Sequence, residues 1–227
     1  MANARDDIIE KGIIAALDLA ETRRWGELTL SDIATAAGLT LNDFHGVASV
    51  ESLAEAVERH FDKAMSGEGI DPEETPRERL FDVIMLRFEA MEARRAGVLS
   101  LVHYREQSPI RLAKHLAVRK ASADWALVSA GLDGADQAVP RDIRSVAVAY
   151  AMAQAERAWR KETDLGFART MSKLDEELRK LEDGAGRFAN FRGGRRKNTS
   201  QPEGEAWDGD PPTSGEGPAD AEPAPQG

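Results

Sequence analysis

The sequence predicts an all-α protein with an N-terminal helix-turn-helix domain, a C-terminal helical bundle and a disordered tail. Until about residue 183, apolar residues recur every three or four positions, which is the helical period. No stretch shows the sustained period of two, with β-branched residues, that is typical of a half-buried strand. Near residue 184 the composition changes sharply. The predicted divisions are therefore residues 1–66, 75–183 and 184–227.

The first helix is predicted over about residues 6–21, because its aliphatic side chains fall on one stripe. The stripe consists of Ile9, Ile13, Leu17 and Ala20. Trp25 and Gly26 follow and close the helix.

Two short helices separated by a glycine turn are predicted next. Thr29 can cap the first of them, and Asp32 stands three residues on, as in a capping box. Gly38 ends this helix at a position that favours a left-handed backbone. Thr40 opens the following helix, again with an acid, Asp43, three residues later. This arrangement predicts a helix-turn-helix.

The remaining helix starts are also marked by caps. Ser49 caps a fourth helix that reaches about Met65. Thr75 caps the first helix of the bundle, with Pro76 at its first position and Glu78 completing a capping box. Further helices are predicted over about residues 98–106, 109–131, 140–161 and 164–182.

The last part of the chain has two compositions. Residues 187–197 form a basic segment, which either pairs loosely with nearby acids or attracts phosphates of nucleic acid or lipid headgroups. Of the 27 residues in 201–227, 11 are proline or glycine. Because too few apolar groups remain to offset the entropy cost of ordering the chain, this segment is predicted to be disordered.

Composition excludes several classes of function. The net charge of -10 argues against a general polyanion binder, because phosphate affinity comes mainly from lysine and arginine. There is no cysteine, which rules out thiolate metal sites and cysteine nucleophiles. The four histidines are scattered, and no catalytic motif is present, so we expect neither an enzyme, nor a metal site, nor a cofactor. With no apolar signal segment at its start, the chain is expected to be cytoplasmic.

The first 65 residues resemble the DNA-binding domain of the tetracycline-repressor (TetR) family of bacterial regulators. The likeness lies in the aliphatic first helix ending at Trp25 and Gly26, the following Thr29, and the run "DIATAAGLT". The second half, through "RERLFDVIMLRFEAM" and "AWRKETDLGFARTMSKLDEELRKLE", is most similar to an alphaproteobacterial group of that family. That group in turn resembles a mitochondrial accessory protein of ubiquinone biosynthesis, which binds lipid rather than DNA.

The resemblance implies a DNA-reading surface around the third helix. The predicted DNA-binding residues are Thr29, Thr40, Leu41, Asn42, His45, Arg5, Lys11 and Arg24. The chain departs from the family pattern after this helix, where His45 replaces a tyrosine and Val50 a lysine. Between Arg24 and Arg59 there are six acids and no basic residue. We therefore expect DNA binding that is weak for each subunit, needs a homodimer and falls steeply with salt.

The resemblance also implies a ligand pocket and a dimer contact in the second domain. A small apolar ligand or lipid is expected between the bundle helices, although aromatic and methionine residues at helical spacing are equally typical of a plain core. The residues concerned are Phe81, Met85, Phe88, Tyr104, Trp125, Tyr150 and Trp159. The dimer is expected to form through the last two helices, about residues 140–182.

Two functions of different class are consistent with the sequence. The first is a ligand-responsive, DNA-binding transcriptional regulator that acts as a homodimer. The alternative is a protein of the same fold that has lost DNA binding and serves as a lipid-binding accessory, in quinone metabolism or at a membrane.

Overall fold

The computed structural model describes residues 4–67, 69–134, 137, 139–163 and 166–197, with side chains as far as residue 190. Within these ranges all regular structure is helical, which confirms the predicted all-α class. The predicted disordered tail beyond residue 197 lies outside the described residues. In the same part of the chain, no helix combines the length and the apolar character needed to cross a membrane.

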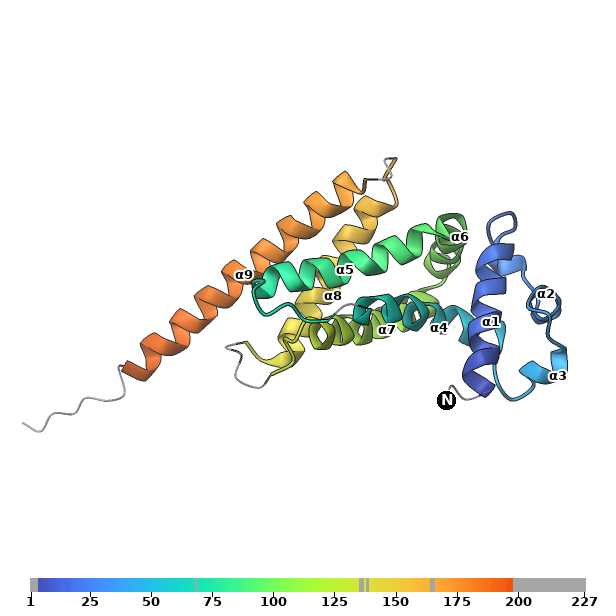
Figure 1. The fold of residues 1–227 in the computed structure, drawn as a ribbon, viewed down its shortest axis with the longest axis horizontal. Coiled ribbons are helices and arrows are strands. Elements are labelled where there is room, and N and C mark those ends of the chain that lie inside the picture. Colours follow the sequence, from blue (N-terminus) through green and yellow to red (C-terminus); the bar gives the residue numbers. More distant parts are fainter. Residues whose placement is uncertain (1–3, 68, 135–136, 138, 164–165, 198–227) are drawn as a thin grey trace, which may run out of the picture.

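The N-terminal helices are α1 (Ala4–Leu19), α2 (Leu30–Ala36), α3 (Leu41–Phe44) and α4 (Val50–Asp62). They surround a small core in which Trp25 and Phe44 are almost completely buried. Gly12 on α1 allows the ring of Phe44 to approach, because a Cβ at this position would lie only 2.9 Å from Phe44 Cε1. Helices α1 to α3 form one end of the elongated molecule (Figure 1).

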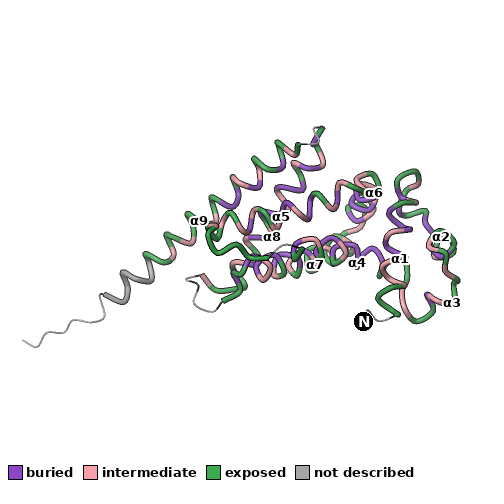
Figure 2. Tube along the Cα trace, viewed as in Figure 1, coloured by how far each residue is buried: buried purple, intermediate pink, exposed green. Residues whose placement is uncertain are grey.

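The bundle consists of α5 (Pro76–Glu92), α6 (Arg95–Glu106), α7 (Pro109–Ser129), α8 (Arg141–Trp159) and α9 (Ala168–Lys197). Buried residues line the inner faces of α4, α5, α7 and α8, as the purple segments in Figure 2 show. At Gly97 on α6 an added Cβ would lie 2.2 Å from the carbonyl oxygen of Leu17. Any larger residue there would separate α6 from α1, so this glycine sets how closely the two parts of the chain pack.

The last helix is longer than the sequence predicts. The disordered tail was expected to begin at residue 184, but α9 continues to Lys197, so for residues 184–197 this prediction is wrong. The apolar stripe of α9 continues through Leu181, Ala185 and Phe188, all of which line a groove against the rest of the bundle. This packing stabilises the second half of α9, although each of its glycines lowers the stability of the helix by roughly 1 kcal/mol relative to alanine.

Candidate nucleic-acid interface and its link to the helical bundle

The turn between α2 and α3 has the closed geometry of a helix-turn-helix. Gly38 adopts a φ of 68°, and the Leu39 amide donates to the Ala34 carbonyl at 2.9 Å. An L residue with a side chain rarely adopts this φ, which explains the glycine. The Thr40 hydroxyl then accepts from the Asp43 amide, and the Thr40 amide donates to Asp43 Oδ2 at 2.8 Å. The orientation of α3 is therefore fixed by local contacts.

Two of the acids on this surface are used within these caps. Asp32 closes the box with Thr29 and also forms an ion pair with Arg23 at 2.8 Å. Hydrogen bonds from Arg23 and then from Thr29 hold the pKa of Asp32 well below its usual range. Hydrogen bonds from the Thr40 amide and hydroxyl likewise lower the pKa of Asp43. Arg23 thus balances the charge of Asp32, whereas Asp43, whose cap partner is a neutral threonine, stays ionised and repels phosphates.

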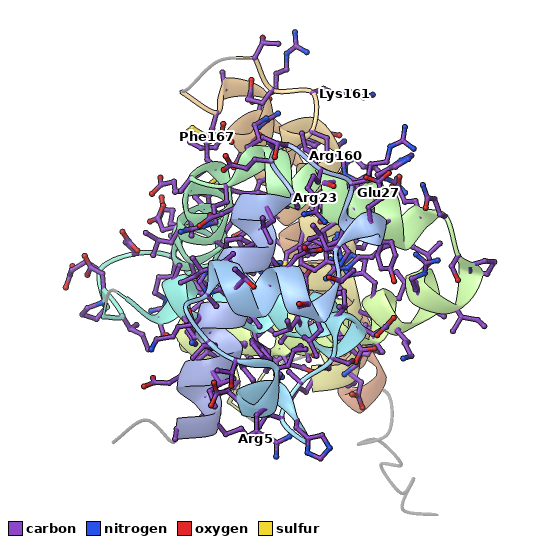
Figure 3. The ribbon with its side chains drawn as sticks, turned by 90° about the vertical axis from the view of Figure 1, so that its right-hand side faces the viewer. Arg5, Arg23, Glu27, Arg160, Lys161 and Phe167 are labelled. Carbon is purple, nitrogen blue, oxygen red and sulfur yellow. The ribbon has the colours of Figure 1, made fainter. Side chains whose placement is uncertain are left out.

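The predicted DNA-binding residues are all exposed at this end of the molecule. Leu41 is 52% exposed, and Asn42 and His45 beside it also face solvent. Arg5, Lys11 and Arg24 are exposed on the flanks. Figure 3 looks onto this end and shows Arg5 and Arg23 at opposite edges of the face.

The two threonines of the predicted set differ from the others. Their hydroxyls each donate to a carboxylate at 2.7 Å, Thr29 to Asp32 and Thr40 to Asp43. They therefore shape the surface as capping residues. Arg23, which the sequence also indicates as a flanking cation, belongs to the same arrangement through its ion pair with Asp32.

A buried ionic network joins α4 to the bundle. Glu58, near the end of α4, accepts from Arg87 on α5 and from Arg105 on α6. Asp62, one turn later, pairs with Arg87 at 2.6 Å and accepts from the Ser122 hydroxyl at 2.7 Å. Burial alone would raise the pKa of Glu58, but the two guanidinium groups hold it well below its usual range. Glu58 is thus the common counter-charge of two buried cations.

The network continues into α7 and α8. Arg119 donates to Glu156 and, at 2.9 Å, to Nε2 of His115. Because an arginine can only donate, Nε2 must accept, and His115 carries its proton on Nδ1, which lies 3.6 Å from Glu58 Oε1. Burial first, and then the neighbouring Arg105 and Arg119, lower the pKa of His115 to about 4 despite the opposing charge of Glu58.

The neutral state of His115 predicts a pH dependence of stability. The pKa of about 4 lies below the ordinary value of 6.5, so below pH 6.5 the unfolded chain binds the proton more readily. Above pH 6.5 His115 is neutral in both states and does not change the free energy of unfolding. As the pH falls from 6.5 to 4, protonation of the unfolded chain lowers this free energy, by about 3 kcal/mol in all. Urea unfolding of wild type and His115→Gln between pH 4 and 7 measures the difference. Parallel curves for the two proteins would contradict the prediction.

The predicted ligand residues are separated in the structure. Met85, Phe88 and Trp159 lie in the core, where the rings of Phe88 and Trp159 are 6.5 Å apart between centroids. Tyr150 is 57% exposed on the outside. The nine-residue spacing of Tyr150 and Trp159 corresponds to a rotation of about 180° around α8, so the two side chains point in opposite directions.

The other three members of the set also lie apart. The guanidinium carbon Cζ of Arg111 lies over the ring of Tyr104, 3.9 Å from the ring centroid. Trp125 is 42% exposed, with its indole N–H donating to the Asp62 carbonyl at 3.1 Å. Phe81 is half-buried on α5. The structure therefore does not bring the seven residues together around one cavity.

Comparison with known proteins identifies the fold. No protein-family model and no curated protein matches the sequence. A TetR transcriptional regulator from Nitrosomonas europaea ATCC 19718 matches with a TM-score of 0.60 and 16% identity, over 78% of this chain and 96% of that one. A TetR regulator from Rhodococcus sp. RHA1 matches with a TM-score of 0.55 and 16% identity, over 75% and 92%. A tetR-family regulator from Streptomyces coelicolor matches with a TM-score of 0.54 and 22% identity, over 89% and 92%.

These likenesses are of fold, since all three identities are low. The chain has the TetR-like arrangement of a helix-turn-helix followed by a helical bundle. The closer similarity to the ubiquinone-biosynthesis group stays a prediction from the sequence.

Proposed function

We propose that the protein is a DNA-binding transcriptional regulator that acts as a homodimer and responds to a small molecule. The observation that carries the proposal is the exposed α2–turn–α3 unit, whose two caps are closed by side chains and whose third helix presents Leu41 and Asn42 to solvent. The TetR regulators with which the chain shares its fold support the same function.

Affinity for DNA is expected to be modest for a single subunit. Arg5, Lys11 and Arg24 are the exposed cations of the predicted set, and residues 25–49, which include α2 and α3, contain no lysine or arginine. Because the release of counterions that drives DNA binding comes from such cations, two copies of the domain are needed for tight binding.

The dimer contact is assigned to the outer face of α8. Ile143, Val146 and Tyr150 follow one another at helical spacing on this face, and each is more than half exposed. The outer face of α9 instead carries ion pairs within the helix, such as Arg179 with Asp175 at 2.5 Å. Of the two helices expected to form the dimer, α8 therefore supplies the apolar surface that a partner copy would cover.

Helix α4 provides the connection that a ligand response requires. It completes the N-terminal domain, and through Glu58 and Asp62 it is bound to α5, α6 and α7. A rearrangement of these bundle helices would therefore move α4 and, in a dimer, alter the spacing of the two α3 helices.

Asn42→Ala tests the DNA-reading role of α3. The amide of Asn42 is exposed and can pair with a base edge, so its loss should weaken binding to the protein's own promoter DNA by roughly 10-fold or more. Binding to a scrambled duplex should not change. Fluorescence anisotropy with both duplexes measures the two affinities.

Thr22→Ala is the matched control, because Thr22 is an exposed residue of the same domain in the turn after α1. It should bind promoter DNA like wild type. Equal promoter affinity of Asn42→Ala and Thr22→Ala would exclude α3 as the reading helix.

A further inference from the structure

A large apolar groove lies at the end of the bundle remote from α1 to α3. It runs between the start of α5, the end of α7, the start of α8 and the second half of α9, and has a volume of about 510 Å³. Figure 1 shows these four segments at the opposite end of the molecule from the helix-turn-helix. Its walls are mainly aliphatic: Leu80, Leu127, Leu132, Val148, Leu178 and Leu181. The volume is within the range typical of small-molecule sites.

Of the described residues that line this groove, three are cations, and two of these are neutralised by carboxylates. Arg77 pairs with Asp175 and, at 3.2 Å, with Glu182. Lys180 pairs with Glu176 and with Glu177. These two side chains are therefore held by acids of α9.

Arg144, on the first turns of α8, is in a different state. Its guanidinium donates to the backbone carbonyls of Leu132 and Gly134, the latter at 3.1 Å. Its Nε is buried and makes no hydrogen bond. Among the described residues, no carboxylate lies within ion-pair distance of it. The groove thus contains one positive charge that the surrounding described side chains do not balance.

We propose that this groove binds a single-chain amphiphilic carboxylate of the fatty-acid class. The aliphatic walls take the hydrocarbon chain, because burying it removes apolar surface from water. The carboxylate lies at Arg144, whose planar guanidinium matches a carboxylate geometrically and whose charge has no carboxylate partner among the described residues. This ligand is complementary to the groove in both shape and charge.

The groove is also connected to the ionic network of α4. Helix α7 carries Leu127 in the groove wall and, five residues earlier, Ser122, which donates to Asp62 at 2.7 Å. A ligand that displaces the end of α7 would therefore act on α4. Binding itself is independent of DNA, whereas this regulatory role rests on the proposed function.

Isothermal titration of the full-length protein, without DNA, tests the site. The probes are decanoate, laurate and myristate below their micellar concentrations, with dodecanol as the uncharged match for laurate. We expect one saturable site for each chain, about 4-fold tighter for every added methylene until the groove is filled. Laurate should bind at least about 10-fold more tightly than dodecanol.

Two substitutions locate the ligand. Arg144→Gln should reduce laurate affinity to that of dodecanol and leave dodecanol binding unchanged. Ala147→Phe, which fills the groove from α8, should abolish binding of both probes. Ala113→Phe, at an exposed position at the other end of α7, is the matched control and should bind like wild type. Thermal melts confirm that each variant is folded.

The proposal is overturned if wild type shows no saturable binding, if affinity does not depend on chain length, or if Ala147→Phe binds laurate like Ala113→Phe. Equal laurate affinity of wild type and Arg144→Gln would exclude Arg144 as the carboxylate partner and would also contradict the proposal. Since no DNA is present, these outcomes are independent of whether the protein binds a promoter.

Discussion

Glu58→Gln is expected to lower the free energy of unfolding by about 3–5 kcal/mol, the usual cost of removing one partner from a buried ion pair. The side chain of Glu58 is almost fully buried and accepts from both Arg87 and Arg105. The amide has nearly the same shape, but it carries no charge and keeps only one accepting oxygen. Both arginines would then remain buried with too little negative charge around them. Urea denaturation at pH 7 measures the change.

Glu55→Gln is the control on the same helix. Glu55 pairs with Lys114 at 2.9 Å near the surface, where both side chains are well exposed. An exposed pair of this kind contributes about 1 kcal/mol or less. If the two variants were equally stable, Glu58 would not be the centre of the connection between α4 and the bundle.

Tyr150→Glu is expected to convert the dimer into monomers. It places a charge on the exposed apolar face formed with Ile143 and Val146, where it would be desolvated by the partner copy. Because tight binding requires two α3 helices on one duplex, promoter affinity should fall by roughly 100-fold or more. Light scattering gives the mass, and anisotropy with promoter DNA gives the affinity.

Met171→Glu serves as the comparison for this variant. Met171 is also exposed, but it lies on α9, outside the proposed contact. This protein should remain dimeric and bind promoter DNA like wild type. A dimeric Tyr150→Glu protein would place the contact on another face, and a monomeric wild type at micromolar concentration would remove the dimer from the proposal.

The helix starts could be predicted because their signals are local. The capping boxes expected at Thr29, Thr40 and Thr75 are all present, and the cap expected at Ser49 is closed by Ser52. Each depends on residues three positions apart, which a sequence shows directly. The helix-turn-helix outline follows from the same signals together with Gly38.

The charges of the candidate interface were harder to interpret. The capping roles of Asp32 and Asp43 follow from the sequence, but the pairing of Asp32 with Arg23 depends on how the turn after α1 folds back. The sequence shows the number of charges but not their partners, so it counts Asp32 as a charge without a counter-ion.

Contacts between helices that are far apart in the sequence could not be predicted. The network around Glu58 joins residues from five helices, and their packing determines which of these charges meet. One signal was present: Arg87 falls on the apolar stripe of α5 between Ile84 and Met91, where a charge needs a buried partner. The separation of the seven residues expected to line a ligand pocket has a related reason, since residue type alone does not show which face of α8 carries Tyr150 and which carries Trp159.

The most direct test of the proposed function is a salt titration of the full-length protein against its own promoter DNA, with a scrambled duplex as control. If Arg5, Lys11 and Arg24 of both copies contact phosphates, six contacts give a slope of about -5 in log affinity against log salt. Preferential binding to the promoter with such a slope is the predicted result. Absence of binding even at low salt would contradict DNA recognition and leave the helix-turn-helix with a structural role only.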